Sequence, residues 1–443
     1  MKKTPVKLLI VLLAVYLLSG CVEAQADTLV ILHPHSSDFA SHVIDGFKTW
    51  YKEDTGRDIT VDTIEKYSGD CWTDVQTWNG TSPEADVWWG GGEFYFEQAR
   101  SAELLVRYKV SEDANVKDYL GGWHLKDDSE ANKDPMWYAA AISGFGIIYN
   151  EEYITANKDT DGTFVPTHWE NLTDPAFFGH ISMCDPDASG STLAAVKQIL
   201  QYMSDATTEI TSNTNVTEGW QYWLQLSGNV GTFTTSSSAV PTAVAEGNAG
   251  VGICIDYYAL DRMLTDDNIG FTYGGATTVS PDPAGIIKGA ANLESAQKFM
   301  DYLIGTEGQT LVGDYRTPAN FKADTADHVP KAWETSGTPT TSFPAISPFS
   351  PSLDGAIHSR VEAVYANYIV KNHAACQDAW EAINLQETAA TKAAALAIYN
   401  RLPSDCNGTI AGFRGLNYKD TTTITNWQNE GAANFAAAET AAT

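Results

Sequence analysis

Residues 137–149 have the sequence Trp-Tyr-Ala-Ala-Ala-Ile-Ser-Gly-Phe-Gly-Ile-Ile-Tyr, an apolar run with no charged side chain. We predict that this run is extended and crosses from one lobe of the protein to another. A second run, Val279 to Ile287, predicts the return crossing. The roughly 420 residues beyond the N-terminal segment exceed what one hydrophobic core usually holds, so at least two lobes are expected.

Strands and helices alternate on both sides of this crossing. Leu29 to Leu32 predicts an apolar strand, and an amphipathic helix follows from Phe39 to Tyr51. A predicted strand followed by a helix recurs at His180 to Cys184 and at Gly250 to Ile255. Strand, loop and helix in succession predict the α/β class, with parallel-type sheets covered by helices. From Leu293 onward the sequence is mainly helical, and the alanine-rich end is expected to fray.

The predicted organisation follows from these patterns. Five segments are expected: 1–20 as a lipoprotein signal peptide, 21–27 as a tether, 28–137 as the first part of lobe 1, 138–286 as lobe 2, and 287–443 as the return to lobe 1 plus a helical C-terminal extension.

The N-terminus predicts export. Lysines at positions 2, 3 and 7 precede the apolar run Leu8 to Leu18, which is too short to span a bilayer. Leu18-Ser19-Gly20-Cys21 has the form of a lipobox, in which the thiol of Cys21 is lipidated. The alternative is an ordinary secretory signal with an incidental cysteine. We expect a lipid-anchored protein at the cell surface or on the periplasmic face of the cytoplasmic membrane.

Charge and cysteine content narrow the classes of partner. The formal net charge of −29 disfavours binding to nucleic acid and favours a monomer, although adaptation to a salty environment would also explain it. Besides Cys21 there are five cysteines, so at least one thiol stays unpaired; Cys376 and Cys406 flank a helical segment and could form a disulfide. The five are Cys71, Cys184, Cys254, Cys376 and Cys406.

Four polar loops stand where predicted strands end and helices begin: His33 to Asp38, Gly90 to Glu93, Asp187 to Ser191, and Ser236 to Ser238. Open α/β sheets bind ligands at such edges, where helix N-termini expose N–H groups. A serine there can cap its own helix instead, but four such loops spread over two lobes favour a cleft. We predict these ligand-binding residues: His35, Ser36, Ser37, Gly91, Gly92, Glu93, Ser143, Ser189, Gly190, Ser191, Ser237, Ser238, Asp256 and Tyr257.

Other chemistries have less support. The three glycines at 90–92 lack the Lys-Ser/Thr of a phosphate-cradling nucleotide loop, and no cofactor is expected. Tyr257 and Tyr258 could ligate a hard metal as phenolates or could form a pocket wall. The sequence contains neither G-x-S-x-G nor H-E-x-x-H, so an enzyme is the weaker alternative. A structural surface protein receives no particular support from the pattern.

Taken in order, several motifs resemble the extracellular solute-binding proteins of ATP-binding-cassette (ABC) importers, and most closely the branch that binds ferric ion or phosphorylated compounds. The resemblance covers roughly residues 28–316 and lies in the lipobox, Ala85-Asp86-Val87-Trp88-Trp89-Gly90-Gly91, Ser143-Gly144-Phe145-Gly146-Ile147-Ile148-Tyr149-Asn150, Asp185-Pro186-Asp187-Ala188-Ser189-Gly190-Ser191, Ala245-Glu246-Gly247-Asn248-Ala249-Gly250-Val251-Gly252, Val279-Ser280-Pro281-Asp282-Pro283 and Ala296-Gln297-Lys298-Phe299.

This resemblance implies a two-lobed, type II periplasmic-binding-protein-like fold that closes around its ligand, with an ABC permease and its ATPase as partners. It also implies a choice of ligand. Ferric binders of this branch use a histidine, a glutamate and a tyrosine pair, to which His33 or His35, Glu93, and Tyr257 with Tyr258 would correspond. Binders of phosphorylated compounds use serines and helix N-termini. We expect a small organic anion, phosphorylated or carboxylated, with ferric ion as the alternative and a secreted lipid-anchored enzyme as the alternative of another class.

Overall fold

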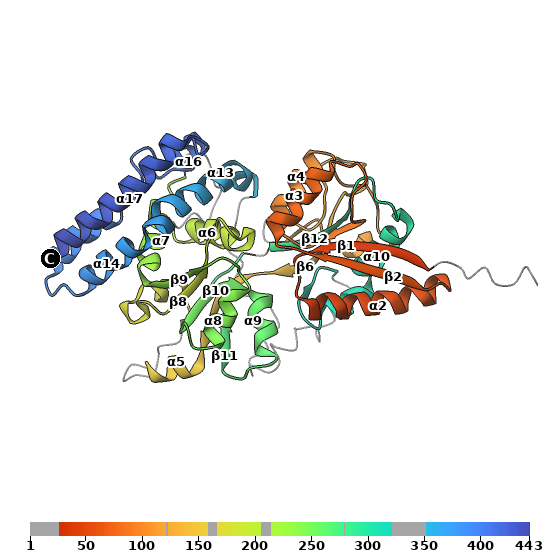
Figure 1. Cartoon of the computed structure of the whole chain (residues 1–443), viewed down its shortest axis with the longest axis horizontal. Helices are drawn as coiled ribbons and strands as arrows, with labels where there is room; N and C mark the ends of the chain where they lie inside the picture. Colours follow the sequence, from red (N-terminus) through yellow and green to blue (C-terminus); the bar gives the residue numbers. More distant parts are fainter. Residues whose placement is uncertain (1–25, 121–122, 158–165, 205–213, 279, 321–350) are drawn as a thin grey trace, which may run out of the picture.

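The computed structural model shows two α/β lobes and a layer of C-terminal helices on the outer side of one of them (Figure 1). The predicted α/β, two-lobed class is thus confirmed. Cys21 and the signal segment lie outside the described residues. In the described part, no helix has both the length and the apolar composition needed to cross a membrane. The structure describes residues 26–120, 123–157, 166–204, 214–278, 280–320 and 351–443, with side chains from 357 in the last range.

Lobe 1 is built on a mixed six-stranded sheet in the order β13-β6-β12-β3-β1-β2. β1 pairs in parallel with β2 and β3, and β12 runs antiparallel to β3 and β6. Its strands are β1 (Asp27–His33), β2 (Ile59–Glu65), β3 (Val87–Trp89), β6 (Tyr138–Ser143), β12 (Ser280–Ile286) and β13 (Thr317–Pro318), beside the hairpin β4 (Tyr119–Leu120) and β5 (Trp123–His124). Its helices are α2 (Ser37–Thr55), α3 (Ser68–Trp78), α4 (Glu93–Ser101), α10 (Leu293–Ile304) and α11 (Thr306–Val312), with a 3₁₀ turn η1 (Asp113–Asn115).

Helix α2 illustrates how the sequence pattern becomes packing in this lobe. Its buried residues Phe39, Val43 and Phe47 recur every four positions and so form one face. Phe47 meets Phe299 of α10 edge-on, with ring centroids 5.1 Å apart. Gly56 ends the helix in the left-handed conformation, with φ of 73°, which glycine adopts without a steric penalty.

Lobe 2 is built on a five-stranded sheet in the order β11-β7-β10-β8-β9. β8 is parallel to β9 and β10, whereas β7 is antiparallel to β10 and β11. Its strands are β7 (Phe145–Asn150), β8 (Ile181–Cys184), β9 (Val230–Thr234), β10 (Val251–Ile255) and β11 (Ile269–Thr272). Its helices are α5 (Glu151–Ala156), α6 (Gly190–Tyr202), α7 (Thr217–Asn229), α8 (Ala239–Ala245) and α9 (Asp256–Met263), with 3₁₀ turns η2 (Trp169–Thr173) and η3 (Pro175–Phe177).

The chain passes between the two sheets at a single residue, Gly144. β6 ends at Ser143 in the first sheet, and β7 begins at Phe145 in the second. The carboxylate of Asp256 accepts a hydrogen bond from the Gly144 amide at 2.8 Å, and the Asp256 amide donates to the Gly144 carbonyl at 2.8 Å. A side chain at 144 would meet Tyr273 and Thr277, so this crossing requires glycine.

The observed boundaries differ from the expected ones. The expected lobe 2, 138–286, includes β6 and β12, but both strands pair in the sheet of lobe 1. Lobe 2 therefore starts at residue 145 and ends before residue 280. Within the expected segment 287–443, the described elements up to β13 belong to lobe 1, and those from α13 onward form the helical extension.

The helical extension covers lobe 2 instead. Its helices α13 and α14 pack on α6 and α7 of that lobe, as the blue ribbons of Figure 1 show. The indole of Trp380 donates to the Asn229 side chain at 2.7 Å, and the ring of His373 contacts the Val230 carbonyl at 2.8 Å. The expected fraying at the C-terminus is wrong, because α17 stays helical and buries Ala438 and Ala442. The extension comprises α13 (Pro351–Val364), the π-helix η4 (Tyr365–Ile369), the turn η5 (Val370–Asn372), α14 (His373–Asn384), α15 (Ala389–Tyr399), α16 (Ile410–Gly415) and α17 (Thr421–Ala442).

The five cysteines of the described part are free and buried, so the disulfide considered for Cys376 and Cys406 is not formed. Cys376 lies in the core of the extension, where its sulfur is 3.0 Å from the hydroxyl of Tyr399. Burial raises the pKa of the Cys376 thiol to about 12, which keeps it protonated and unreactive at neutral pH.

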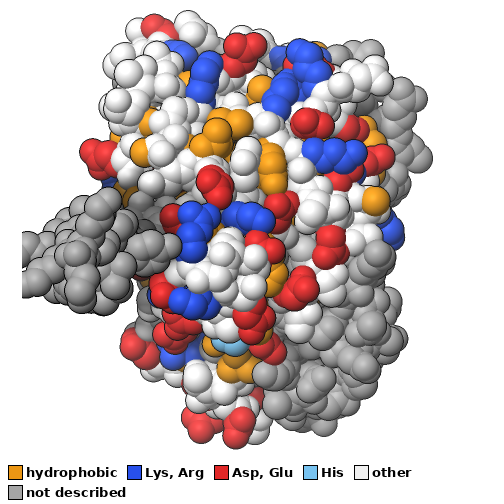
Figure 2. Space-filling view, turned by 90° about the vertical axis from the view of Figure 1, so that its right-hand side faces the viewer, with side chains coloured by type: hydrophobic (Ala, Val, Ile, Leu, Met, Phe, Trp, Pro, Cys, Tyr) orange, Lys and Arg blue, Asp and Glu red, His pale blue; other side chains and the backbone are white. Residues whose placement is uncertain are grey.

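The surface of lobe 1 mixes both signs of charge. Figure 2 shows acidic and basic side chains interspersed on this face. Some of them form ion pairs, such as Lys298 with Asp54 at 2.7 Å and Lys52 with Asp58 at 2.6 Å. Exposed pairs of this kind contribute little to stability, but they distribute the charge over the face.

Candidate ligand-binding site

A small cavity of about 60 Å³ lies where lobe 1, lobe 2 and the extension meet, and we call it the inner cavity. Pockets that hold small-molecule ligands usually exceed about 300 Å³, so this cavity is smaller than a typical ligand site. The inner cavity is lined by Ser68, Gly91, Gly92, Glu93, Phe94, Tyr95, Trp123, Ser143, Phe145, Gly190, Ser191, Ala194, Lys197, Ser237, Ile255, Tyr257, Tyr258, Ser280, Pro281, Asp282 and His358.

The wall from lobe 2 begins at the N-terminus of helix α6. Ser189 caps this helix by accepting from the Thr192 amide at 3.2 Å, while its hydroxyl lies 3.0 Å from that of Ser191. Capping therefore occupies Ser189, and Gly190 and Ser191 face the cavity. Because the peptide dipoles of α6 align, its N-terminal turn carries a partial positive charge beside the cavity.

The same wall carries a buried lysine. Lys197 is 1% exposed and lines the cavity two turns along α6. Its ammonium nitrogen lies 2.7 Å from Nδ1 of His358. Burial, and next the charge of Lys197, lower the pKa of His358 to about 2, so this histidine is neutral and its Nδ1 accepts a hydrogen bond from the Lys197 ammonium. Lys197 therefore brings a positive charge to the wall of the cavity.

The backbone of two glycines, from a run of three, forms part of the cavity wall that belongs to lobe 1. Gly90, Gly91 and Gly92 all have positive φ, of 93°, 115° and 88°, which bring the chain from β3 into α4. The Gly91 amide donates to the carboxylate of Asp282 at 3.1 Å. Glu93, at the first position of α4, is buried and also lines the cavity.

Two tyrosines of α9 form the side of the cavity next to the crossing at Gly144. The rings of Tyr257 and Tyr258 meet edge-on, with centroids 4.5 Å apart. On lobe 1, the guanidinium of Arg316 lies 3.8 Å from the ring centroid of Tyr257 and 3.8 Å from that of Phe39. Burial raises the pKa of both phenols, well above 10 for Tyr257, so the neutral form is favoured at physiological pH.

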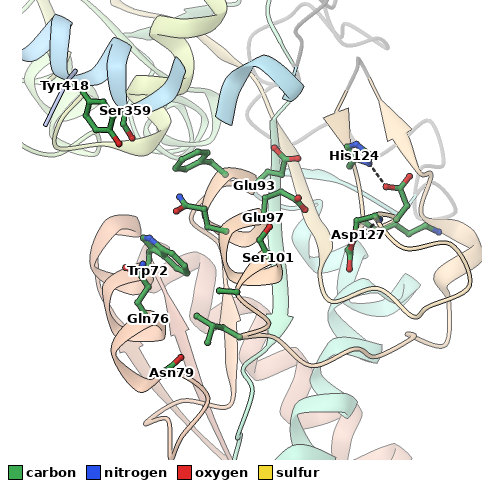
Figure 3. A pocket seen from close by; sticks show the side chains of 17 residues that line it. Trp72, Gln76, Asn79, Glu93, Glu97, Ser101, His124, Asp127, Ser359 and Tyr418 are labelled. Atoms are coloured by element: carbon green, nitrogen blue, oxygen red, sulfur yellow. Dashed lines mark hydrogen bonds and ion pairs between the residues drawn. The ribbon is translucent and has the colours of Figure 1, made fainter. Parts of the chain in front are cut away.

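A larger open groove of about 1100 Å³ lies outside the inner cavity, and we call it the outer groove. Its walls are α3 and α4 of lobe 1, the segment around His124 and Asp127, and Ser359 and Tyr418 of the extension (Figure 3). Glu93 and Phe94 line both spaces. The outer groove therefore adjoins the inner cavity at the start of α4.

The structure brings together eight of the predicted ligand residues: Gly91, Gly92, Glu93, Ser143, Gly190, Ser191, Ser237 and Tyr257. Tyr258, which was predicted only as an alternative metal ligand, also lines the inner cavity. Six others do not line the inner cavity: His35, Ser36, Ser37, Ser189, Ser238 and Asp256. His35 is buried behind Asp282, Ser189 caps α6, and Asp256 holds the Gly144 crossing.

Among the cavity residues that the prediction missed, three carry an ammonium, a carboxyl or an imidazole group. The sequence does contain an indication of Lys197 as a site residue, because it is the only charged residue in the otherwise mainly apolar run Leu193 to Leu200 of a predicted helix. Asp282 stood in a quoted motif but was given no role. His358 had no usable signal, since only the tertiary packing of the extension brings it to the cavity.

A cavity enclosed between two α/β lobes, with serines, glycines and one helix N-terminus in its walls, defines a two-lobed binding protein of the periplasmic-binding-protein type. The family model for bacterial extracellular solute-binding proteins matches residues 85–335. The chain belongs to this family, which places it in the periplasm or at the cell surface.

Sequence relatives agree with this assignment. The chain is 27% identical over 250 residues to the phosphoglycerate transport regulatory protein PgtC of Salmonella typhimurium, covering 56% of this chain and 58% of PgtC. The match thus spans less than two thirds of that relative. An uncharacterized protein of Haemophilus influenzae is 26% identical over 271 residues, covering 57% of this chain and 68% of that protein.

Solved structures share the fold at lower identity. The periplasmic binding protein AfuA of Actinobacillus pleuropneumoniae, with fructose-6-phosphate bound, has a TM-score of 0.59 at 20% identity and covers 77% of this chain and 98% of its own. The Trichodesmium protein FutA, in complex with iron and citrate, has a TM-score of 0.52 at 18% identity and covers 76% and 98%.

Proposed function

We propose that the chain is the substrate-binding component of an ABC importer and captures a small organic anion, phosphorylated or carboxylated, between its lobes. The observation that carries this proposal is Lys197. A buried ammonium faces the inner cavity beside the N-terminus of α6, with Ser191 and Ser237 as hydroxyl donors. A cation, a helix N-terminus and hydroxyl groups together form a favourable environment for an oxyanion.

The relatives support an anionic ligand but do not agree on its identity. PgtC carries phosphoglycerate in its name, and the AfuA structure contains a sugar phosphate, whereas the Trichodesmium structure contains iron and citrate. Ferric ion is the second candidate, because Tyr257 and Tyr258 both line the cavity. A ferric site would need these phenols ionised as ligands, and the ammonium of Lys197 in the same cavity wall repels a trivalent cation. The anion is therefore the better candidate.

The inner cavity also favours binding over catalysis. It is enclosed by groups from both lobes, and its small volume means that a solute enters while the lobes are apart and is enclosed when they close. Such a cycle supports capture and delivery to a permease. If the same solute were chemically converted by the purified protein, the enzyme alternative would replace this proposal.

A thermal-shift screen tests the proposed ligand class, with phosphorylated sugars, glycerol 3-phosphate, glycerate, inorganic phosphate and ferric citrate as probes. We expect stabilisation by an organic anion, in proportion to ln(1 + [L]/Kd). Lys197→Met should abolish it, whereas Lys288→Met, at an exposed position of lobe 1, should not. Stabilisation by ferric ion alone, lost in the double variant Tyr257→Phe/Tyr258→Phe, would replace the anion with the metal.

We propose further that Cys21 anchors the protein to the membrane and so keeps it near its permease. Because the site Leu18-Ser19-Gly20-Cys21 has lipobox form, Cys21→Ala should release the protein from the membrane fraction or block its processing. Metabolic labelling with a palmitate analogue measures the modification directly. Unchanged fractionation of the Cys21→Ala protein would refute the anchor.

A further inference from the structure

The floor of the inner cavity is formed by the two strands that join the lobes. On the paired strands β6 and β12, Ser143 is the register partner of Ser280, and both line the cavity. The register shifts between Asp282 and Pro283, as in a β-bulge. Asp282 precedes this shift and lies two positions from Ser280 on the same face of β12, so it joins the two serines in the cavity wall.

Only one of the two carboxylate oxygens of Asp282 accepts a hydrogen bond from the described residues. Its Oδ1 accepts the amide of Gly91 at 3.1 Å. Its Oδ2 is buried and has no hydrogen-bond partner among the described residues, and the hydroxyl of Ser143 is in the same position. Burying such a group without a partner is unfavourable, so a native structure normally pairs it with water or ligand.

Donors without acceptors lie directly behind Asp282. Nδ1 of His35 is 3.8 Å from Oδ2, too far for a hydrogen bond, and both ring nitrogens lack partners in the described part. Arg316 is 1% exposed, and none of its three guanidinium nitrogens has a hydrogen-bond partner there. Burial raises the pKa of the Asp282 carboxyl, and the positive charge of Arg316 opposes this shift.

The two ends of the cavity therefore differ in chemistry. The lobe 2 wall offers the ammonium of Lys197 and the α6 N-terminus, whereas the lobe 1 side offers the carboxylates of Asp282 and Glu93. An oxyanion can only accept hydrogen bonds, so at the floor it would face Asp282 and be repelled. A hydroxyl group can donate to a carboxylate and accept from a serine hydroxyl.

We propose that Asp282 and Ser143 form a hydroxyl-recognising subsite, with Asp282 as the specificity-determining residue. The ligand is then a hydroxylated organic anion, bound with its charged end toward Lys197 and a hydroxyl group toward Asp282. This inference rests on the proposed function and narrows its substrate class. A ligand without a hydroxyl group would leave Oδ2 buried and unpaired, and the site would reject it for that reason.

Isothermal titration calorimetry on the full chain tests the subsite with matched probes. These are glycerol 3-phosphate against n-propyl phosphate, and glycerate against propionate. We expect the hydroxylated member of at least one pair to bind 10-fold or more tightly. Asp282→Asn keeps the acceptor for Gly91 but presents an amide donor at Oδ2, so it should reduce that ratio to below about 3-fold. Asp62→Asn, at an exposed position of β2, should leave the ratio unchanged.

Ser143→Ala is the second variant, because it removes one hydroxyl without altering charge and should lower the same ratio in a folded protein. If anions bind but each pair binds equally, or if the ratio survives in Asp282→Asn and Ser143→Ala, the subsite is refuted and anion capture stands. If no probe in either pair binds the wild type, the proposed anion function fails, and the subsite fails with it.

Discussion

The imidazole ring of His358 lies flat against the phenyl ring of Phe94, with centroids 3.5 Å apart and planes 7° from parallel. Phe94 belongs to α4 of lobe 1, and His358 belongs to the extension that packs on lobe 2. The pair thus connects the two halves of the molecule. Phe94 lines both the outer groove and the inner cavity, so the stacked rings lie between the two spaces.

Weakening this stack should speed release of bound solute. Aromatic pairs contribute about 0.5–1.5 kcal/mol beyond the area they bury, so Phe94→Leu should raise the dissociation rate of glycerol 3-phosphate roughly 2- to 10-fold. Stopped-flow tryptophan fluorescence measures this rate. Tyr67→Leu, at a ring of lobe 1 that is 64% exposed, is the control and should have no effect. An unchanged rate in Phe94→Leu would show that the stack does not hold the lobes together.

The glycine run before α4 permits a graded test of backbone strain. At Gly92, with φ of 88°, an added Cβ meets nothing within 4 Å, so Gly92→Ala should cost only the strain of positive φ, about 1–2 kcal/mol. At Gly90, with φ of 93°, the same Cβ would also meet the buried ring of His35. We expect Gly90→Ala to cost at least about 2 kcal/mol more, measured by urea unfolding. Equal costs would mean that His35 moves aside freely.

Glu362 should make stability depend on pH. Burial, and next Asp187, raise the pKa of this carboxyl from 4.5 to about 7. The pKa of Glu362 is higher in the folded protein than in the unfolded chain. Its contribution to the free energy of unfolding is therefore complete below pH 4.5 and is lost as the pH rises through 7. Glu362→Gln stays neutral, so its stability relative to wild type should increase across this window, by on the order of 2 kcal/mol at pH 8.

Chemical unfolding of both proteins at pH 4.5, 6 and 8 measures the difference. Glu381→Gln, at an exposed site on α14, is the matched control and should follow the wild type at each pH. A constant difference between Glu362→Gln and wild type would indicate that Glu362 titrates normally in the folded protein.

The sequence predicted the alternation of strands and helices well, because burial imposes a regular apolar pattern on each element. It could not locate the crossing at Gly144, since the residues on both sides are equally apolar and only hydrogen bonding shows that β6 and β7 belong to different sheets. The packing of the extension on lobe 2 was equally inaccessible. Contacts between Trp380 and Asn229, separated by 151 residues, leave no local pattern.

The site was predicted in part for the same reason. Loops at strand ends are visible in sequence, and eight of the predicted residues line the cavity. His35 was a sound expectation by position, yet its ring turns into the core between Phe39 and Trp89. Asp282 shares a face of β12 with Ser280, but only the pairing of β12 with β6 shows that this face lines the cavity.

The extension should unfold together with lobe 2 and not as a separate unit. Trp380 is 4% exposed, and its indole donates to Asn229 at the end of α7. Trp380→Ala removes this bond and leaves a cavity, which should cost about 3–5 kcal/mol. Leu385→Ala, at a side chain that is 73% exposed, should cost almost nothing. Hydrogen exchange in Trp380→Ala should show α7 and α14 losing protection to the same extent. If α14 opened alone while α7 stayed protected, the extension would be an independent domain, and His358 could leave the cavity without disturbing the lobe that carries Lys197.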